Sequence, residues 1–208
     1  MTTTPAPPRR ARARRGEGER LREEILDAAG RLLLDTGSVD AVSIRAVADA
    51  AGVTPPSIYL HFPDKDALMA AVCAVRFGEF DAYVDSAGAA SDDPVESLLL
   101  RGRAYVRFGV ENPEHYRILF MSRSDYGLDT PGHEAAAAAF EHLVGAVTAC
   151  IDSGAFAPRD PTLVSIQLWV TLHGLTSLLI SKQGFPWPPL DELVETILRA
   201  QITGLAAG

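Results

Sequence analysis

The stretch TPPSIYLHF, in the first third of the chain, places a serine, a tyrosine and a histidine in one short segment. The hydroxyl and imidazole groups of Ser57, Tyr59 and His61 can bond phosphate oxygens or base edges. Ile58 and Phe62 are four residues apart, so on a helix they share one face, which we expect to point inward. We interpret the segment as a short helix whose outer face suits contact with nucleic acid.

Patterns typical of catalysis or metal binding do not occur in the sequence. There is no HExxH, CxxC, GxSxG or phosphate-loop motif. His133 and Glu134 are adjacent, but the next histidine, His142, is nine residues further on. Cys73 and Cys150 lie on separate apolar stretches and fit buried free thiols in a reducing cytoplasm. We therefore expect no metal, no cofactor and no enzyme activity, and an all-α enzyme is the least favoured alternative.

Two further helices are predicted before this segment. Helical periodicity begins near Arg20 and ends at Gly37, a residue type that favours the left-handed turn after a helix. Ser43 is a good N-cap for a second helix, and Gly52 provides a tight turn after it. These helices and the short helix that follows form a helix-turn-helix, in which a helix of two turns can enter a major groove about 12 Å wide.

The consecutive prolines are expected to begin the short helix. Thr54 can cap it, and Pro55 and Pro56 then fall in the first turn, where amide protons have no intrahelical partner. Pro63 is expected to end this helix, and Asp64 to cap a long helix that runs into the low eighties. The prolines therefore mark the start of a helix.

The remainder of the chain also reads as helical, and no convincing strand is present. Helices are predicted at residues 94–112, 113–121, 133–153, 161–182 and 190–205, with a loop at 122–132. The fold class is all-α, with about nine helices. We divide the chain into a disordered basic arm at 1–18, a helix-turn-helix DNA-binding domain at 19–66, and a helical ligand-binding and dimerisation domain at 67–208.

Charge is distributed unevenly along the chain. The net charge is −8, yet residues 1–80 carry eleven Lys/Arg and eleven Asp/Glu, so all of the excess acid lies in residues 81–208. Five arginines fall within residues 9–15, and such an arm can lie along phosphates or enter a minor groove. A solubilising tail is the alternative. No run of 18 apolar residues and no signal peptide is seen, so we expect a cytoplasmic protein without a membrane span.

The first 72 residues contain ILDAAGRLLLDTG followed by VSIRAVADAAGVTPPSIYLHFPDKDALMAAV. The order and spacing of particular residues in them resemble the DNA-binding domain of the tetracycline-repressor (TetR) family of bacterial transcription regulators. These residues are Ala48, Gly52, Val53, Ile58, Tyr59, His61, Phe62, Lys65 and Leu68. Further on, NPEHYR at 112–117 and Trp169 with His173-Gly174 resemble a C-terminal domain of one branch of that family, named for its Trp-His-Gly (WHG) signature.

The resemblance implies a DNA contact at each matching position. Ser43 and Arg45 would contact a phosphate and a base edge, and His61 and Lys65 would hold phosphates. The groove would be faced by Thr54, Pro55, Pro56, Ser57 and Tyr59. For Arg45 the alternative is a solvated surface residue, and for Tyr59 it is simple packing.

A helix N-terminus can bind phosphate through its backbone N–H groups, but the two prolines remove two of these donors. Their rings offer apolar surface instead. We expect Pro55 or Pro56 to pack on a thymine methyl group.

The acidic C-terminal part is expected to dimerise and to sense a ligand. The resemblance implies that the last two helices of each subunit pack as four. Candidate interface residues are Leu163, Ile166, Trp169, Val170, Leu178, Leu193, Ile197 and Leu198. Candidate pocket residues are Phe77, Phe80, Tyr105, Phe108, Tyr116, Met121, Trp169 and His173. The alternative for each pocket residue is an ordinary place in the core.

These observations predict a ligand-responsive transcriptional repressor, located in the bacterial cytoplasm at the nucleoid. Its partners would be a palindromic double-stranded DNA operator, a second copy of the chain and a small-molecule effector of unknown identity. The alternative is an activator or co-regulator that gains DNA affinity with ligand.

Overall fold

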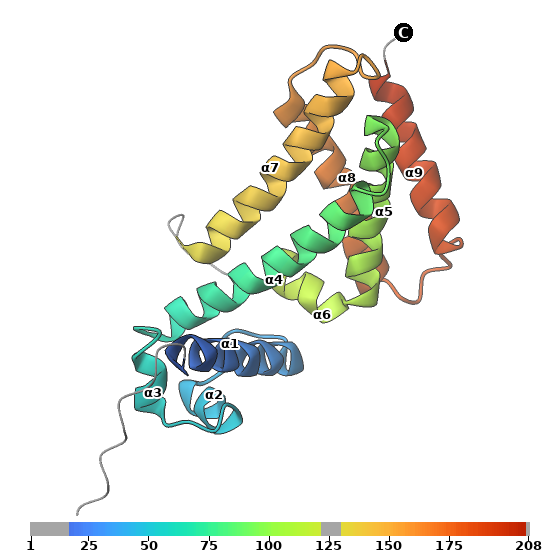
Figure 1. Cartoon of the computed structure of the whole chain (residues 1–208). Helices are drawn as coiled ribbons and strands as arrows, with labels where there is room; N and C mark the ends of the chain where they lie inside the picture. Colours follow the sequence, from blue (N-terminus) through green and yellow to red (C-terminus); the bar gives the residue numbers. More distant parts are fainter. Residues whose placement is uncertain (1–16, 122–129, 207–208) are drawn as a thin grey trace, which may run out of the picture.

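The first three helices form a compact unit at one end of the molecule (Figure 1). The computed structural model describes residues 17–121 and 130–206, so nearly all of the predicted arm and most of the predicted 122–132 loop lie outside the described residues. Helix α1 spans Glu17–Thr36, α2 spans Ile44–Ala50 and α3 spans Pro55–Tyr59. Gly37 and Gly52 have positive φ angles of 63° and 66°, which lets the chain turn sharply after α1 and α2.

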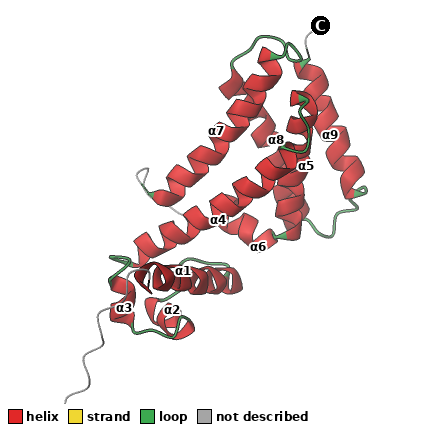
Figure 2. Cartoon of the chain, viewed as in Figure 1, coloured by secondary structure: helices red, strands yellow, loops and turns green. Residues whose placement is uncertain are grey.

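The rest of the described chain is also helical (Figure 2). The elements are α4 (Lys65–Gly88), α5 (Pro94–Glu111), α6 (Pro113–Tyr116), the π-helical segment η1 (Arg117–Met121), α7 (Pro131–Asp152), α8 (Pro161–Ser181) and α9 (Leu190–Leu205). Within the described residues there are nine α-helices and no strand beyond an isolated bridge between Phe156 and Ala206. The all-α prediction is confirmed.

Polar N-caps begin most of these helices. Oγ of Ser43 accepts a hydrogen bond from the Ala46 amide at 3.1 Å, and Oδ1 of Asp64 accepts one from the Ala67 amide at 2.7 Å. Each cap satisfies an amide that has no intrahelical partner. Both caps agree with the sequence prediction.

The short helix α3 differs from the prediction in two details. Thr54 occupies its N-cap position, but its hydroxyl lies 2.9 Å from the Ser57 hydroxyl and caps no amide. Pro55 and Pro56 have no amide hydrogen to donate, and the Ser57 amide donates to the Thr54 carbonyl oxygen at 2.8 Å, so the Thr54 side chain is left for the contact with Ser57. The helix also ends at Tyr59, before Pro63, because the chain passes into a turn.

Helix α4 belongs to both hydrophobic clusters of the protein. Its first turns contribute Leu68 and Val72 to the cluster built on α1–α3, and its later turns contribute Phe77 and Phe80 to the cluster among α5, α8 and α9. The helix runs without a break to Gly88, beyond the low eighties that the sequence predicts. The proposed domain boundary after residue 66 thus falls in the first turn of a helix that both parts share, and the division stays a prediction.

Helices α7 and α8 are long and apolar enough to cross a membrane, by length and composition alone. The sequence predicts no membrane span. The finding is weak evidence, because a core helix passes the same test, and α8 buries Leu168 and Leu172 against its neighbours. Glu141 lies near the middle of α7, and a carboxylate there is costly inside a bilayer.

Candidate nucleic-acid interface and cavity

The outer faces of α2 and α3 present most of the predicted DNA-contacting residues to solvent. Ser43 and Arg45 are exposed at the start of α2, and Arg45 forms no ion pair with a described residue. Thr54, Pro55 and Pro56 are exposed at the start of α3, where Ser57 is half-buried. The guanidinium of Arg45 is therefore free to bond a base edge or a phosphate.

Two exposed and two buried side chains lie in the last turn of α3 and directly after it. Ile58 and Phe62 are buried in the first hydrophobic cluster, as the sequence predicts. Tyr59 is 52% exposed and Leu60 is 84% exposed. Leu60 is not among the DNA contacts predicted from the sequence, because nothing in the sequence distinguishes it from the other apolar residues. An apolar side chain left in water beside Tyr59 is suited to contact with thymine methyl groups.

His61 and Lys65 lie half-buried where α3 gives way to α4. Nζ of Lys65 donates to the carbonyl oxygen of Asp40 at 3.3 Å, which ties the start of α4 to the segment before α2. An ammonium group has three donors, so two remain for phosphate oxygens. Lys65 can thus fix the loop and contact DNA at once.

The helix-turn-helix unit itself is acidic. Residues 17–66 contain ten Asp/Glu and five Lys/Arg, a net charge of −5, while the five arginines of residues 9–15 carry +5. Attraction to phosphates is dominated by cationic side chains. The arginine-rich segment is therefore the densest cluster of positive charge in the first 66 residues.

A cavity of about 580 Å³ lies among α4, α5, α7, α8 and α9. Four of the eight predicted pocket residues line it, namely Phe77, Phe80, Tyr105 and Trp169. Most of the remaining wall is aliphatic or aromatic, which suits an apolar or aromatic molecule. The volume lies within the usual range of about 300–1,000 Å³ for small-molecule sites.

The other four predicted pocket residues lie outside this cavity. Phe108 packs behind Phe80, with ring centroids 5.2 Å apart, and Met121 is exposed on η1. Tyr116 is fully buried, and its hydroxyl lies 2.8 Å from both the Tyr105 hydroxyl and Nδ1 of His173. Phe108, Tyr116 and His173 form a layer behind the wall. They contact the wall residues Phe80, Tyr105, Phe120 and Trp169.

Burial sets the protonation of this layer. It raises the pKa of Tyr116 to about 12 and raises the pKa of Tyr105 even further. Burial also lowers the pKa of the His173 imidazole. At neutral pH all three groups are therefore uncharged hydrogen-bonding partners.

The charged residues at the cavity wall are not among those predicted from the sequence. Nδ1 of His142 on α7 lies 2.8 Å from Oδ2 of Asp81 on α4, and Arg101 on α5 forms an ion pair with Asp85 at 2.7 Å. Asp81 and Asp85 follow Phe77 at four-residue steps, so they share its helix face. That spacing is the one sequence signal that could have identified them.

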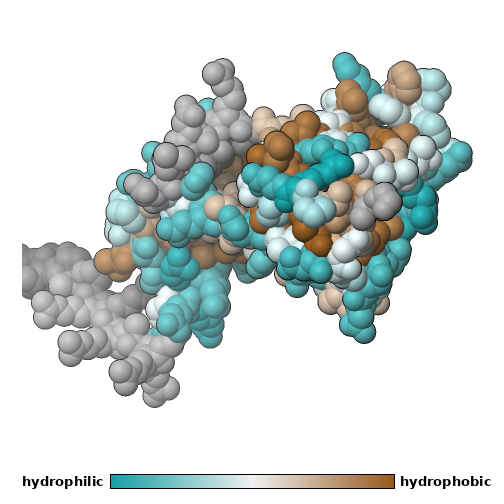
Figure 3. All heavy atoms as spheres, turned by 90° about the horizontal axis from the view of Figure 1, so that it is seen from above, coloured by the Kyte–Doolittle hydropathy of each residue, from teal (hydrophilic) through white to brown (hydrophobic). Residues whose placement is uncertain are grey.

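A strip of apolar side chains on α8 faces solvent. Its members are Leu163, Ile166, Val170 and Leu178, four of the predicted interface residues. Trp169, also predicted there, contributes to the cavity wall as well. Leu198 is buried within its own subunit, and Leu193 and Ile197 are partly buried beside it. Figure 3 shows hydrophobic residues gathered on the C-terminal part of the molecule, with hydrophilic residues around them.

Comparison with known families agrees with this architecture. Residues 25–72 match the bacterial regulatory proteins of the tetR family, and residues 98–201 match the tetracyclin repressor-like, C-terminal domain. The two matches cover the helix-turn-helix unit and most of the cavity-forming helices. The chain belongs to the TetR family of bacterial helix-turn-helix transcriptional regulators. Its assignment to the Trp-His-Gly branch stays a prediction.

Individual relatives span nearly the whole chain. YobS of Bacillus subtilis, an HTH-type transcriptional regulator, is 28% identical over 87% of this chain and 90% of its own length. A solved structure from Rhodococcus sp. RHA1 has a TM-score of 0.79 at 26% identity and covers 90% of this chain and 96% of that chain. FadR from Bacillus subtilis, solved with stearoyl-CoA, has a TM-score of 0.71 at 19% identity, over 88% and 98%, a likeness of fold alone.

Proposed function

We propose that the protein is a homodimeric repressor that binds a palindromic operator in double-stranded DNA and leaves it when a small molecule occupies the cavity. The observation that carries the proposal is the course of α4. Its first turns pack in the cluster beneath the exposed α3, and its later turns supply Phe77 and Phe80 to the cavity wall. One rigid helix therefore touches both the DNA-facing unit and the ligand site.

A dimer is supported by the size of the reading surface and by the α8 strip. Helix α3 has five residues and reaches few bases, so two copies are needed for a specific site. The strip of Leu163, Ile166, Val170 and Leu178 offers apolar surface that a second copy would cover. Two-fold pairing through this strip would match a two-fold operator.

Ligand response is supported by the cavity and its link to α4. A molecule that binds one position of α4 better than another shifts the population of the two states. A change in α4 alters the separation of the two α3 helices in a dimer, and with it the affinity for the operator. Repression is supported by the match to a repressor-like C-terminal domain. An activator or co-regulator would use the same contacts with the opposite preference.

The family consists of transcriptional regulators, and we extend this to the absence of enzyme activity in this chain. No group of three or more potential metal ligands exists among the described residues. We also place the protein in the bacterial cytoplasm at the nucleoid, where its operator would be.

The test begins with selection of binding sites from random-sequence DNA by the full chain. Wild type, Tyr59→Ala and Leu60→Ala are then titrated against the selected site and a scrambled one. Phe185→Ala is the matched control, because Phe185 is 56% exposed on the loop between α8 and α9, far from α3. We expect a palindromic site, about a tenfold or greater loss for each α3 variant, and wild-type affinity for the control.

The sign of regulation is read from a reporter placed behind the selected site. Deletion of the regulator should raise expression from the reporter if the protein is a repressor, and lower it if the protein is an activator. Equal binding of wild type and Tyr59→Ala to the selected site would contradict DNA reading by α3.

A further inference from the structure

The cavity wall carries a carboxylate that pairs with no described lysine or arginine. Asp81 reaches the wall from α4, and its Oδ2 lies 2.8 Å from Nδ1 of His142. Its other oxygen, Oδ1, has no hydrogen-bond partner among the described residues. One strong acceptor therefore borders an otherwise mostly apolar space.

The one guanidinium at the described wall is engaged with a carboxylate, although its buried Nε has no hydrogen-bond partner. The guanidinium of Arg101 forms an ion pair with Asp85 at 2.7 Å. Its Nε packs against Gly88, at the place where a side chain on Gly88 would collide with it. Asp81 and Asp85 are one turn apart on α4. Arg101 pairs with Asp85, and Asp81 pairs with the His142 imidazole, which carries a charge only when protonated. Among the described residues that line the cavity, no lysine and no second arginine is present to offset Asp81 for an anionic ligand.

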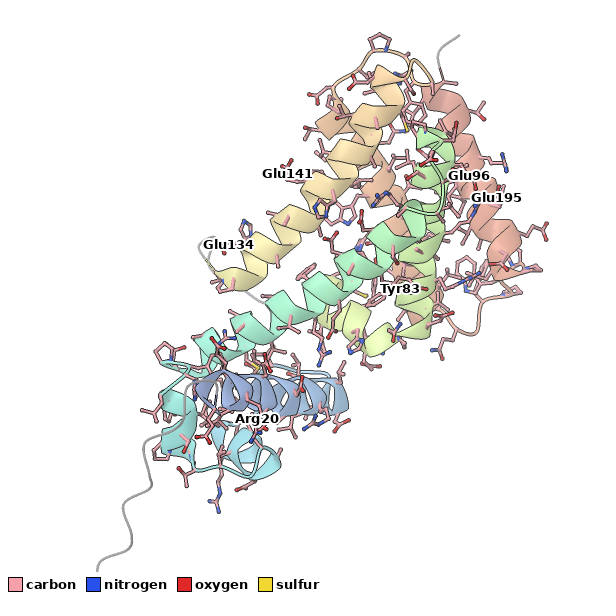
Figure 4. All side chains as sticks on the ribbon, viewed as in Figure 1. Arg20, Tyr83, Glu96, Glu134, Glu141 and Glu195 are labelled. Atoms are coloured by element: carbon pink, nitrogen blue, oxygen red, sulfur yellow. The ribbon has the colours of Figure 1, made fainter. Side chains whose placement is uncertain are left out.

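Other acidic residues near the cavity point elsewhere. Figure 4 shows Glu134 and Glu141 on the side of α7 that faces away from α4. Asp81 is the one acidic residue among the described residues that line the cavity. Asp81 is therefore the one carboxylate among the described wall residues that can bond a cation in the cavity.

Aromatic rings surround the same space. Phe77, Phe80 and Tyr105 contribute from α4 and α5, and Phe140 packs edge-on against Trp169 with ring centroids 6.2 Å apart. Aromatic faces attract cations, more strongly where water is excluded. A carboxylate beside aromatic rings is the set of groups that recognises a protonated amine with an apolar body.

We propose that the effector is a lipophilic cation, an apolar or aromatic molecule with one protonated amine that bonds to the Asp81 carboxylate. The apolar body fills the space between α4, α5 and α8, and the amine lies at the contact between α4 and α7. This inference rests on the proposed function only in taking the cavity as the effector site.

Dodecylamine, dodecanol and dodecanoate test the proposal, because they share one chain and differ in the charge of the head group. Their binding to the DNA-free full chain is followed by calorimetry and by the fluorescence of the wall residue Trp169. The variant is Asp81→Asn. The matched control is Glu141→Gln, which removes an equal charge from the outer side of α7. Melting temperature and operator affinity are recorded for each protein to establish folding.

We expect the wild type to bind dodecylamine about tenfold or more tightly than dodecanol, and dodecanoate most weakly. Asp81→Asn should reduce the preference for the amine to near unity and leave dodecanol binding unchanged, while Glu141→Gln should behave as wild type. Equal binding of the three probes, tightest binding of dodecanoate, no binding of dodecylamine, or a preference that persists in Asp81→Asn would each overturn the proposal. Operator binding in the same samples tests the regulator function separately.

Discussion

The hydroxyl of Tyr116 on α6 lies 2.8 Å from Nδ1 of His173 on α8, directly behind the cavity wall. The same hydroxyl lies 2.8 Å from that of Tyr105 on α5. Three helices are thereby joined by two hydrogen bonds. The Tyr116 ring is fully buried, so a hydrogen bond removed there cannot be replaced by solvent.

Replacement of Tyr116 by Phe leaves the Tyr105 hydroxyl and the His173 imidazole without this partner. We expect the free energy of unfolding to fall by about 1–3 kcal/mol, measured by urea denaturation. Tyr83→Phe is the control, because its ring also packs on Phe108 while its hydroxyl bonds to no described residue (Figure 4). Equal effects of the two substitutions would contradict a role for the hydrogen bonds.

Gly109 on α5 lies where three helices meet. A Cβ at this position would collide with the methyl group of Thr176 and stand 2.8 Å from the Tyr116 ring. Both neighbours are fully buried and cannot move away. We expect Gly109→Ala to lower the melting temperature and to cost about 1–3 kcal/mol by overpacking.

Gly145→Ala is the matched control for Gly109→Ala. Gly145 also lies within a helix, α7, but a Cβ there meets no atom within 4 Å. Alanine favours the helix by up to about 1 kcal/mol over glycine, so Gly145→Ala should stabilise the protein. If both variants shift the melting temperature in the same direction, the crowding at Gly109 is not decisive.

His115 should make the protein less stable in acid. Burial lowers the pKa of its imidazole, and the adjacent Arg76 adds to the effect. The unfolded chain therefore binds the proton more tightly, so stability is complete above the unfolded pKa of about 6.5 and falls as the pH drops below it. His115→Gln should flatten the loss of melting temperature between neutral and mildly acidic pH.

His133→Gln is the control for that titration, since His133 is exposed at the start of α7. It should retain the wild-type pH dependence. His173 shifts in the same direction through burial, so a part of the acid sensitivity should persist in His115→Gln. A wild-type pH profile in His115→Gln would show that His115 does not contribute.

The arginine-rich segment should supply much of the salt dependence of DNA binding. Replacement of the five arginines in residues 9–15 by serine leaves an acidic helix-turn-helix unit. The slope of log affinity against log salt should become shallower by roughly one unit for each phosphate that is no longer neutralised. Titrations at several salt concentrations measure this slope. An unchanged slope would favour the solubilising-tail alternative.

The prolines of α3 predict a contact with thymine. Pro55 and Pro56 are exposed beside Tyr59, and uracil differs from thymine only by the missing methyl group. Substitution of uracil at single thymines of the operator should weaken binding at one position or more, by a few-fold at most. Cytosine and 5-methylcytosine, which also differ by one methyl group, serve as the control pair at other positions of the operator. Wild-type affinity at every substituted thymine would exclude the contact.

Local signals predicted most helix boundaries well. Asp64, Pro94 and Pro161 lie at the starts of helices because a capping side chain or a proline is favoured there whatever the tertiary context. The sequence underestimates the length of α4, since its second half is stabilised by packing against α5 and α7. The π-helical segment η1 has no signature in the sequence that separates it from the helix before it.

The cavity could be predicted only in part. Residue type assigns aromatic side chains to it, and Phe108 and Tyr116 share that type while lying behind the wall. The approach of Asp81 to His142 joins residues 61 positions apart, which no local pattern reports. Which side of an aromatic layer faces empty space depends on how α4, α5 and α8 cross.

The sequence by itself determined the helical class, the helix-turn-helix and the polar face of α3, because these follow from spacing, caps and turns within a few residues of each other. The tertiary structure alone decided that Leu60 remains in water, that Leu198 is buried, and that Asp81 faces the cavity without a described lysine or arginine as its partner. Burial and pairing arise from contacts between distant segments, and these exist only once the helices have packed.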